Sequence, residues 1–242
     1  MIVTFTDFGA SGPYLGQMEL AVRRVAPQVP VFHLMADAPA FDPFSSAYLL
    51  AALARDMPTG AVLLGVVDPG VGGERSPLVA KADGIWLVGP DNGLFEAMMR
   101  RCEDLAVWAI HWRPKRMSAT FHGRDLFAPV AARLALGQTP AEIGCRPVPP
   151  PLHVDWPEDL GAVVYVDHYG NAWTGLRAAS VPETAEIEVA GRRLSRRRTF
   201  GDVPAGQAFW YENSSGLVEI AVNGGRADSL DGVGPGAIVT IC

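Results

Sequence analysis

Ile2-Val3-Thr4-Phe5-Thr6-Asp7-Phe8-Gly9, at the start of the chain, alternates β-branched and aromatic residues up to an acid. This pattern predicts a β-strand over residues 2–7, and the glycines and proline at 9–13 predict a loop after it. Over residues 14–26 the apolar side chains recur at a helical spacing, so a helix is expected to follow. A strand that leads through a loop into a helix is the repeating unit of an α/β fold.

The same order of elements recurs along the first 146 residues. We expect a strand, a helix, a buried strand, a hairpin and two further helices at residues 31–34, 44–55, 61–67, 78–88, 92–101 and 124–136. The buried strand is apolar throughout, as in a central strand that is covered on both faces. The pattern predicts an N-terminal α/β domain, residues 1–146, with a mostly parallel sheet flanked by helices.

Prolines at 147 and 149–151 then interrupt every period, and residues 147–157 are expected to form a Pro-rich linker. Beyond the linker, residues 158–242 show no helical period. Short β-rich segments occur there at 162–166, 185–189, 208–211, 217–222 and 237–241. This half of the chain predicts a small all-β domain, and we expect a barrel.

Composition narrows the class of protein. The 242 residues are 49% hydrophobic, enough for a full core, and the net charge of −6 lacks the positive surface that nucleic-acid binding requires. No apolar stretch reaches the roughly 20 residues of a membrane span, and strand-like residues follow Met1 directly, so we expect no membrane association and a cytoplasmic location. Cys102, Cys145 and Cys242 lack metal-type spacing, so we expect reduced thiols and no metal.

Polar clusters stand at the ends of the predicted strands, where open α/β sheets bind their ligands. Asp7 can accept hydrogen bonds from the hydroxyls of a ribose, or it can cap a helix. Asp68 follows the buried strand in the run Val-Asp-Pro-Gly-Val-Gly-Gly-Glu-Arg at 67–75, and Arg75 can pair with it in a functional or a purely structural ion pair. His122 directly precedes a helix, whose N-terminal dipole is expected to lower its pKa and favour the neutral imidazole, although a lone histidine can also be structural.

A fourth cluster lies in the predicted β domain. Asp-His-Tyr-Gly-Asn-Ala-Trp occupies 167–173, and Asn-Ser-Ser-Gly follows at 213–216. The glycine and asparagine of the first run are explained equally well by a turn. No single cluster therefore decides a function.

Taken together and in order, the motifs resemble one family. They are Thr6-Asp7-Phe8-Gly9, Val66-Val67-Asp68-Pro69-Gly70-Val71-Gly72, Gly89-Pro90-Asp91-Asn92-Gly93, Thr120-Phe121-His122-Gly123-Arg124-Asp125 with Phe127-Ala128-Pro129, and Gly170-Asn171. Over nearly its whole length the chain is similar to the adenosine-forming S-adenosylmethionine hydrolases, also called SAM hydroxide adenosyltransferases. This family is related to the fluorinases and chlorinases.

The resemblance implies an enzyme that hydrolyses S-adenosylmethionine, a small-molecule substrate, to adenosine and methionine without a cofactor. Asp68, Arg75 and His122 would position and activate the water that attacks the ribose 5′-carbon, and Asp7 would hold the ribose hydroxyls. The other substrate-binding residues that the resemblance implies are Phe8, Phe41, Asn92, Asp167, Tyr169, Asn171, Trp173 and Ser214. It also implies a homotrimer whose sites lie at subunit interfaces, between the N-terminal domain of one subunit and the C-terminal domain of the next.

Three positions depart from the family pattern. Gly12 stands where an acid usually follows the first motif, Met35-Ala36 replaces a Thr-His pair, and Gly175 replaces an asparagine. These departures leave open a second hypothesis, a non-catalytic or weakly catalytic protein that binds S-adenosylmethionine or a nucleoside. A 5′-halogenase is disfavoured, because the Tyr, Thr and Tyr-Ser of the halide-using relatives are here Asp68, Val71 and His122-Gly123.

Overall fold

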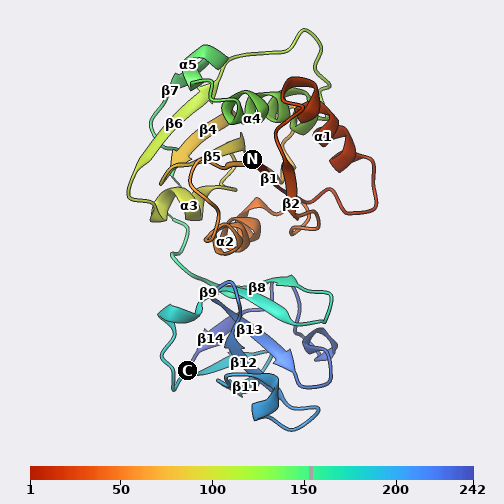
Figure 1. Ribbon diagram of the computed structural model, residues 1–242. Helices are drawn as coiled ribbons and strands as arrows, with labels where there is room; N and C mark the ends of the chain where they lie inside the picture. The colour runs from red at the N-terminus through yellow and green to blue at the C-terminus, as the bar shows by residue number, and fades with distance from the viewer. Residues whose placement is uncertain (153–154) are drawn as a thin grey trace. The chain divides into compact units, whose positions relative to one another are not determined.

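The computed structural model describes residues 1–152 and 155–242; positions 153 and 154 of the predicted linker lie outside the described residues. The chain forms two compact units, Met1–Asp155 and Trp156–Cys242 (Figure 1). Among the described residues, none of the helices combines the length and the apolar character that crossing a bilayer needs.

The N-terminal unit is built on a seven-stranded sheet in the order β2-β1-β3-β5-β4-β6-β7. The pairings β1–β2, β1–β3 and β3–β5 are parallel, whereas β4, β6 and β7 extend the sheet through antiparallel pairings. The strands are β1 (Ile2–Thr6), β2 (Val31–Met35), β3 (Val62–Val66), β4 (Pro77–Ala82), β5 (Ile85–Pro90), β6 (Leu105–Ile110) and β7 (Cys145–Pro147). The predicted α/β fold with a mostly parallel sheet is confirmed.

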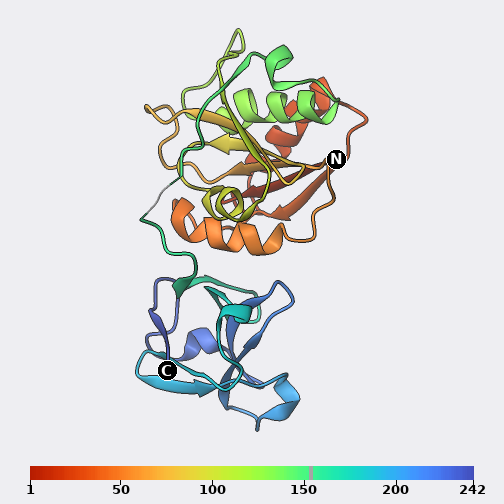
Figure 2. The same ribbon diagram turned by 90° about the vertical axis from the view of Figure 1, so that its left-hand side faces the viewer.

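Helices cover both faces of this sheet (Figures 1 and 2). One face carries α1 (Tyr14–Val25) and α4 (Ala128–Ala135), which pack against each other, and the opposite face carries α2 (Pro43–Leu53) and α3 (Glu96–Arg101). A short helix, α5 (Pro140–Ile143), precedes β7. Fully buried residues of α1 and of the sheet, such as Met18, Ile2 and Leu64, belong to one core cluster. Each such side chain stabilises the fold by about 1.5–3 kcal/mol relative to an exposed one.

Local chemistry explains several element boundaries. The β4–β5 hairpin turns at Asp83 and Gly84, whose φ angles of 46° and 84° suit the tight turn that matches strand twist, so the predicted hairpin is confirmed. Helix α2 begins where the Asp42 carboxylate accepts a hydrogen bond of 3.0 Å from the N–H of Ser45, with Pro43 at the first helical position.

Two predicted helices begin differently from expectation. The helix expected at 92–101 starts only at Glu96, because the Asn92 side chain accepts a hydrogen bond from the N–H of Leu94 and Gly93 turns the backbone at a φ of 90°. The helix expected at 124–136 opens with a π-helical turn, Gly123–Phe127, before α4. Strands β6 and β7 were not predicted.

The C-terminal unit contains two antiparallel sheets, ordered β12-β13-β9-β8 and β11-β10-β14. Its strands are β8 (Leu160–Val166), β9 (Ala172–Arg177), β10 (Glu186–Val189), β11 (Arg192–Ser195), β12 (Ala208–Glu212), β13 (Leu217–Val222) and β14 (Val239–Ile241). The edges of the two sheets are linked by isolated bridges, Ala162 to Ile238 and Arg196 to Trp210. The all-β character is as expected, but no closed barrel is formed by the described strand ladders, and the barrel stays a prediction.

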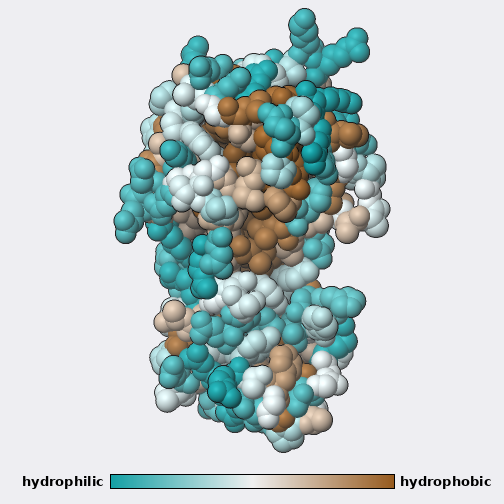
Figure 3. Space-filling model, viewed as in Figure 1, coloured by the Kyte–Doolittle hydropathy of each residue, from teal (hydrophilic) through white to brown (hydrophobic). Residues whose placement is uncertain are grey.

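Apolar side chains are not confined to the core of the N-terminal unit. In Figure 3 apolar residues gather on the face of that unit turned toward the viewer. Large apolar side chains left exposed in this unit include Tyr14, Leu20, Phe32, Leu34 and Phe41. Contiguous exposed apolar surface of this kind is typical of binding sites and of interfaces.

Candidate active site

A cavity of about 340 Å³ lies in the N-terminal unit, at the carboxyl ends of the parallel strands β1 and β3. This is the edge at which α/β sheets place ligands. Its lining residues are Asp7, Phe8, Tyr14, Phe41, Val66, Asp68, Val71, Thr120, Phe121, His122 and Gly123. Asp7, Phe8, Phe41, Asp68 and His122, all expected from the sequence, are thus brought together.

Arg75 joins two polar side chains of this cavity, Asp68 and His122. Its Nε donates to Asp68 Oδ1 at 2.9 Å, and its Nη2 donates to Asp68 Oδ2 and, at 2.9 Å, to His122 Nδ1. The Asp68 and Arg75 side chains are 4% and 11% exposed, so little water competes with these contacts. The guanidinium also lies over the Phe127 ring, 5.3 Å from its centroid. Arg75 does not line the cavity itself but holds the two side chains that do.

The contact with Arg75 fixes the tautomer of His122. A guanidinium only donates, so His122 Nδ1 must accept, and the proton of the neutral ring is on Nε2. Burial and then the positive charge of Arg75 hold the pKa of His122 below its ordinary value. The lowered pKa agrees with expectation, but its causes are burial and Arg75 rather than the helix dipole that the sequence suggested. His122 can therefore donate a hydrogen bond from Nε2, and it offers no free nitrogen lone pair while Arg75 stays in place.

A glycine lets the loop after β3 and the segment before His122 approach each other. Gly72 has a φ of 79°, and a Cβ at this position would lie 2.5 Å from the carbonyl oxygen of Ala119. Only glycine allows the loop after β3 to pack on the segment that leads to His122.

Asp7 and Phe41 form the opposite part of the lining. Asp7 Oδ2 accepts a hydrogen bond of 3.0 Å from the N–H of Phe41. Phe41 has a φ of 59°, a left-handed conformation that is unfavourable for a bulky residue, and it is 77% exposed. Burial raises the pKa of Asp7. Strain that is held at an exposed aromatic beside a half-buried carboxylate is typical of a ligand site.

Asn92, expected to bind substrate, is not among the lining residues. Its Nδ2 donates to the carbonyl oxygen of Val67 at 2.8 Å, and its Oδ1 accepts from the N–H of Leu94 at 3.2 Å. Asn92 thus fixes the backbone directly before Asp68, and its place in the structure is that of a support for the loop after β3.

Sequence reasoning missed two aromatic residues in the wall of the cavity, Tyr14 and Phe121, which pack against the expected Phe8. The rings of Phe8, Tyr14 and Phe121 pack edge to face, with centroid separations of 6.0, 5.7 and 5.5 Å. Phe121 adjoins His122, and Tyr14 is the first residue of α1 after the glycine-rich loop. The available signal for both residues in the sequence was their position in or next to the Phe8 and His122 motifs.

A second cavity, of about 730 Å³, lies in the C-terminal unit. All five residues expected from this half of the chain line it, namely Asp167, Tyr169, Asn171, Trp173 and Ser214. Asp167 accepts hydrogen bonds from the backbone N–H of Asn171 at 2.9 Å and from the indole N–H of Trp173 at 3.4 Å. The lining also includes Asn213, from the motif at 213–216, and Tyr211 and Glu219, which the sequence did not single out.

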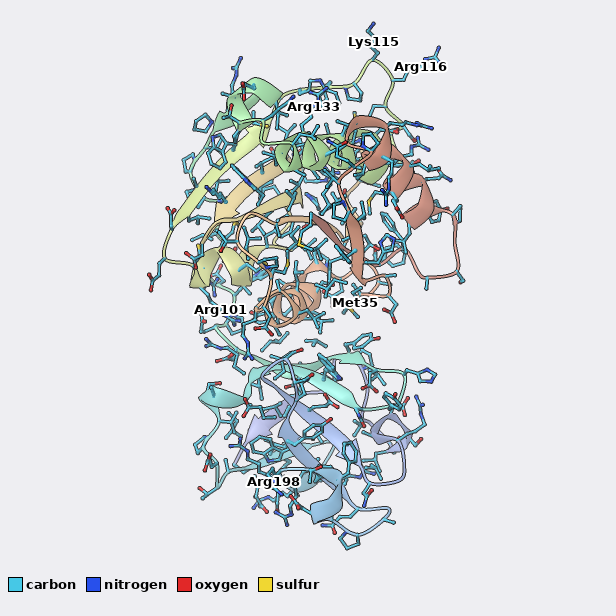
Figure 4. All side chains as sticks on the ribbon, in the orientation of Figure 1. Met35, Arg101, Lys115, Arg116, Arg133 and Arg198 are labelled. Atoms are coloured by element: carbon cyan, nitrogen blue, oxygen red, sulfur yellow. The ribbon has the colours of Figure 1, made fainter. Side chains whose placement is uncertain are left out.

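Of the departures from the family pattern, the one at Gly175 has a structural explanation. A Cβ at Gly175 would lie 2.6 Å from Leu160 Cβ, so the β8–β9 pairing leaves no space for a side chain there. Met35, labelled in Figure 4, is 8% exposed at the end of β2. Gly12 has room for a side chain: a Cβ there would make only ordinary van der Waals contacts, with Tyr14 Cδ2 at 3.7 Å and the carbonyl oxygen of Phe8 at 3.8 Å.

The cysteines are free thiols: Cys145 is buried, Cys102 partly buried and Cys242 exposed. Burial raises the pKa of Cys145 to about 11, which makes it unreactive. Within residues 1–152 and 155–242, no group of three or more His, Cys, Asp or Glu side chains is arranged to hold a metal ion.

Comparison with known proteins gives consistent matches along the chain. Residues 2–144 match the family model described as the SAM hydroxide adenosyltransferase N-terminal domain, and residues 161–240 match that of the C-terminal domain. A protein of Salinispora arenicola named (R)-S-adenosyl-L-methionine hydrolase is 41% identical over 246 residues, covering 96% of this chain and 93% of its own. The Thermus thermophilus protein of the same name is 39% identical over 255 residues, covering 98% and 97%.

More distant similarity is also found. A crystal structure of an uncharacterized conserved protein from Thermotoga maritima superposes with a TM-score of 0.91 at 29% identity, covering all of both chains. A fluorinase of Actinopolyspora mzabensis is 26% identical over 195 residues, covering 67% of this chain and 65% of its own. With both domain models matched and relatives about 40% identical over nearly full length, the chain belongs to the SAM hydroxide adenosyltransferase family.

Proposed function

We propose that the chain hydrolyses S-adenosyl-L-methionine to adenosine and L-methionine. The observation that carries this proposal is the N-terminal cavity, where Asp68 and His122 are held by one guanidinium and face the same space as Asp7 and Phe41. The names of the full-length relatives support the same activity. These relatives are named hydrolases of the (R) form, so we take the (R)-sulfonium epimer as the preferred substrate.

In this reaction the oxygen of water attacks the ribose 5′-carbon while the carbon–sulfur bond breaks. The bonding electron pair goes to sulfur, which turns the positively charged sulfonium into the neutral thioether of methionine, and one proton of the water is lost. The leaving group therefore needs no acid catalyst, and the main task of the protein is to align the nucleophile with the C–S bond.

The residues divide this task. His122 donates its Nε2–H to the water oxygen, and the Asp68 carboxylate accepts a water hydrogen and is the expected proton acceptor. Arg75 holds the Asp68 and His122 side chains in position and balances the charge of Asp68. Asp7 holds the ribose hydroxyls, and Phe8 and Phe41 contact the nucleoside. Closure of the cavity around the substrate would exclude bulk water.

The residues Asp167, Tyr169, Asn171, Trp173 and Ser214 are proposed to contact the methionine and adenine parts of the substrate. They line a cavity of the C-terminal unit, whereas the residues for ribose and water lie in the N-terminal unit. We propose a homotrimer in which the N-terminal unit of one subunit meets the C-terminal unit of the next. Exposed apolar side chains in the N-terminal unit, such as Phe32, support an interface. Light scattering at micromolar concentration should give the mass of a trimer, and a monodisperse monomer would exclude this assembly.

The activity is tested by incubating the protein with separated (R) and (S) epimers and measuring adenosine and methionine by chromatography. We expect equimolar products, faster from the (R) epimer, and their loss in Asp68→Ala. Binding of either epimer without product at any pH between about 6 and 9 would instead support the second hypothesis, a binding protein, for which the open position at Gly12 is the supporting observation.

A further inference from the structure

The cavity of the C-terminal unit contains a buried carboxylate that the proposed substrate contacts leave unexplained. Glu219, on β13, is 2% exposed and lines the cavity. Burying an ionised carboxylate costs several kcal/mol unless donors compensate it. The partners of Glu219 are therefore informative.

Both oxygens of Glu219 accept hydrogen bonds from neighbouring side chains. The Tyr211 hydroxyl donates to Oε1, and Asn213 Nδ2 donates to Oε2 at 3.0 Å. The Asn213 amide cannot flip, because its Oδ1 accepts the N–H groups of Ser215 and Leu217, each at 3.0 Å. Burial, and then Glu219, raise the pKa of Tyr211, so the phenol keeps the proton that it donates.

This arrangement sets the hydrogen-bonding character of the wall. Because Tyr211 gives its only O–H to Glu219, its oxygen can offer only lone pairs to a ligand. The Asp167 carboxylate adds further acceptors beside it. Burial raises the pKa of Glu219, and the hydrogen bonds from Tyr211 and Asn213 oppose this shift by stabilising the carboxylate.

The cation in this lining is already engaged. Arg226 donates from Nε and Nη2 to Asp228 at 2.9 and 2.8 Å, and from Nη1 to the carbonyl oxygen of His168 at 3.0 Å. Its charge is thereby balanced, and the cavity stays rich in hydrogen-bond acceptors.

We propose that the Glu219–Tyr211 pair makes this cavity a receptor for an amino or ammonium group of the substrate, with Glu219 as the positioning residue. The inference rests on the proposed function, since S-adenosylmethionine carries two such groups, the 6-amino group of adenine and the α-ammonium of methionine. The shared chemistry is an N–H donor flanked by aromatic surface, which Trp173 and Phe200 supply.

Binding of matched ligand pairs to the full-length protein tests this proposal by calorimetry. The pairs are adenosine with inosine, which has a carbonyl oxygen in place of the 6-amino group, and L-methionine with 4-(methylthio)butanoate, which lacks the α-amino group. We expect a preference of about tenfold or more for the amino-bearing member of one pair, and that pair identifies the group that is recognised.

Glu219→Gln should remove this preference. Because Asn213 can only donate here, a glutamine of equal size keeps its oxygen toward Asn213 and turns its NH₂ toward Tyr211. The Tyr211 oxygen then accepts from this NH₂, and its freed O–H faces the ligand as a donor. Tyr211→Phe, which deletes the accepting oxygen, should remove it as well and serves if Glu219→Gln does not fold. Glu212→Gln, an exposed acid on β12 paired with Arg196, is the matched control and should keep the preference.

Equal affinity of the wild-type protein for both members of each pair would overturn the proposal, as would an unchanged preference in both variants. Turnover of S-adenosylmethionine by a protein without the preference refutes the receptor and leaves the proposed function intact. A preference without turnover refutes the proposed function and supports the receptor.

Discussion

Arg75→Lys separates the charge of the Arg75 guanidinium from its shape. Arg75 donates to both oxygens of Asp68 and to His122 Nδ1, whereas an ammonium is a point charge that cannot span all three acceptors. At least one charge-assisted hydrogen bond is lost, worth about 1.5–3 kcal/mol. At about 1.4 kcal/mol per factor of ten, kcat should fall roughly 10- to 100-fold.

The Michaelis constant should change little, because Arg75 does not line the cavity. Steady-state kinetics of adenosine release from the (R) epimer measure both constants. Arg177→Lys is the matched control: Arg177, in the C-terminal unit, makes a similar two-point contact with Asp159, at 2.6 and 2.8 Å, and is not among the residues that line either cavity. A kcat of Arg75→Lys within about twofold of wild type, or an equal loss in Arg177→Lys, would refute the role assigned to the guanidinium.

Three further predictions concern single residues. Protonation of His122 places an N–H against the Arg75 guanidinium, so kcat should fall as the pH drops through the pKa of His122. Since this pKa is lowered from 6.5, the midpoint of a pH–rate profile should lie below pH 6.5. A midpoint above pH 6.5 would contradict the contact between His122 and Arg75. Phe41→Ala should raise KM about tenfold, because the aromatic contact with the nucleoside is lost. Thermal unfolding should be unchanged, because Phe41 is 77% exposed. An unchanged KM would exclude packing of the nucleoside on Phe41. In denaturant titrations, Gly72→Ala should lower the free energy of unfolding by about 2 kcal/mol more than Gly60→Ala. Both glycines have positive φ, but of the two only Gly72 lacks space for a Cβ. Equal losses of stability in the two variants would exclude the close contact between Gly72 and Ala119.

Local patterns predicted much of the N-terminal fold. Alternation over β1, the helical spacing of α1 and the turn residues Asp83-Gly84 each act within a few neighbouring residues, so sequence alone indicates them. Strand β7 has only three residues and forms through pairing with β6, a tertiary contact without a local pattern. The start of α3 was missed because a side chain, Asn92, competes for the backbone hydrogen bonds.

For the candidate site, too, sequence motifs predicted the residues, and only the structure shows their contacts. Motifs identified Asp68, Arg75 and His122 as residue types, but only the structure shows that Arg75 donates to Nδ1 and so makes His122 a donor from Nε2. Glu219 went unnoticed because its significance comes from burial and from the convergence of Tyr211 and other donors, which no short motif encodes.

Direct attack of water on the ribose carbon is the central claim, and hydrolysis in water enriched in the heavy oxygen isotope tests it most directly. Mass spectrometry of the products should find one heavy oxygen atom in adenosine, at the 5′-position, and none in methionine. Adenosine without the label, or label in methionine, would contradict attack of water at the 5′-carbon and with it the roles assigned to Asp68 and His122.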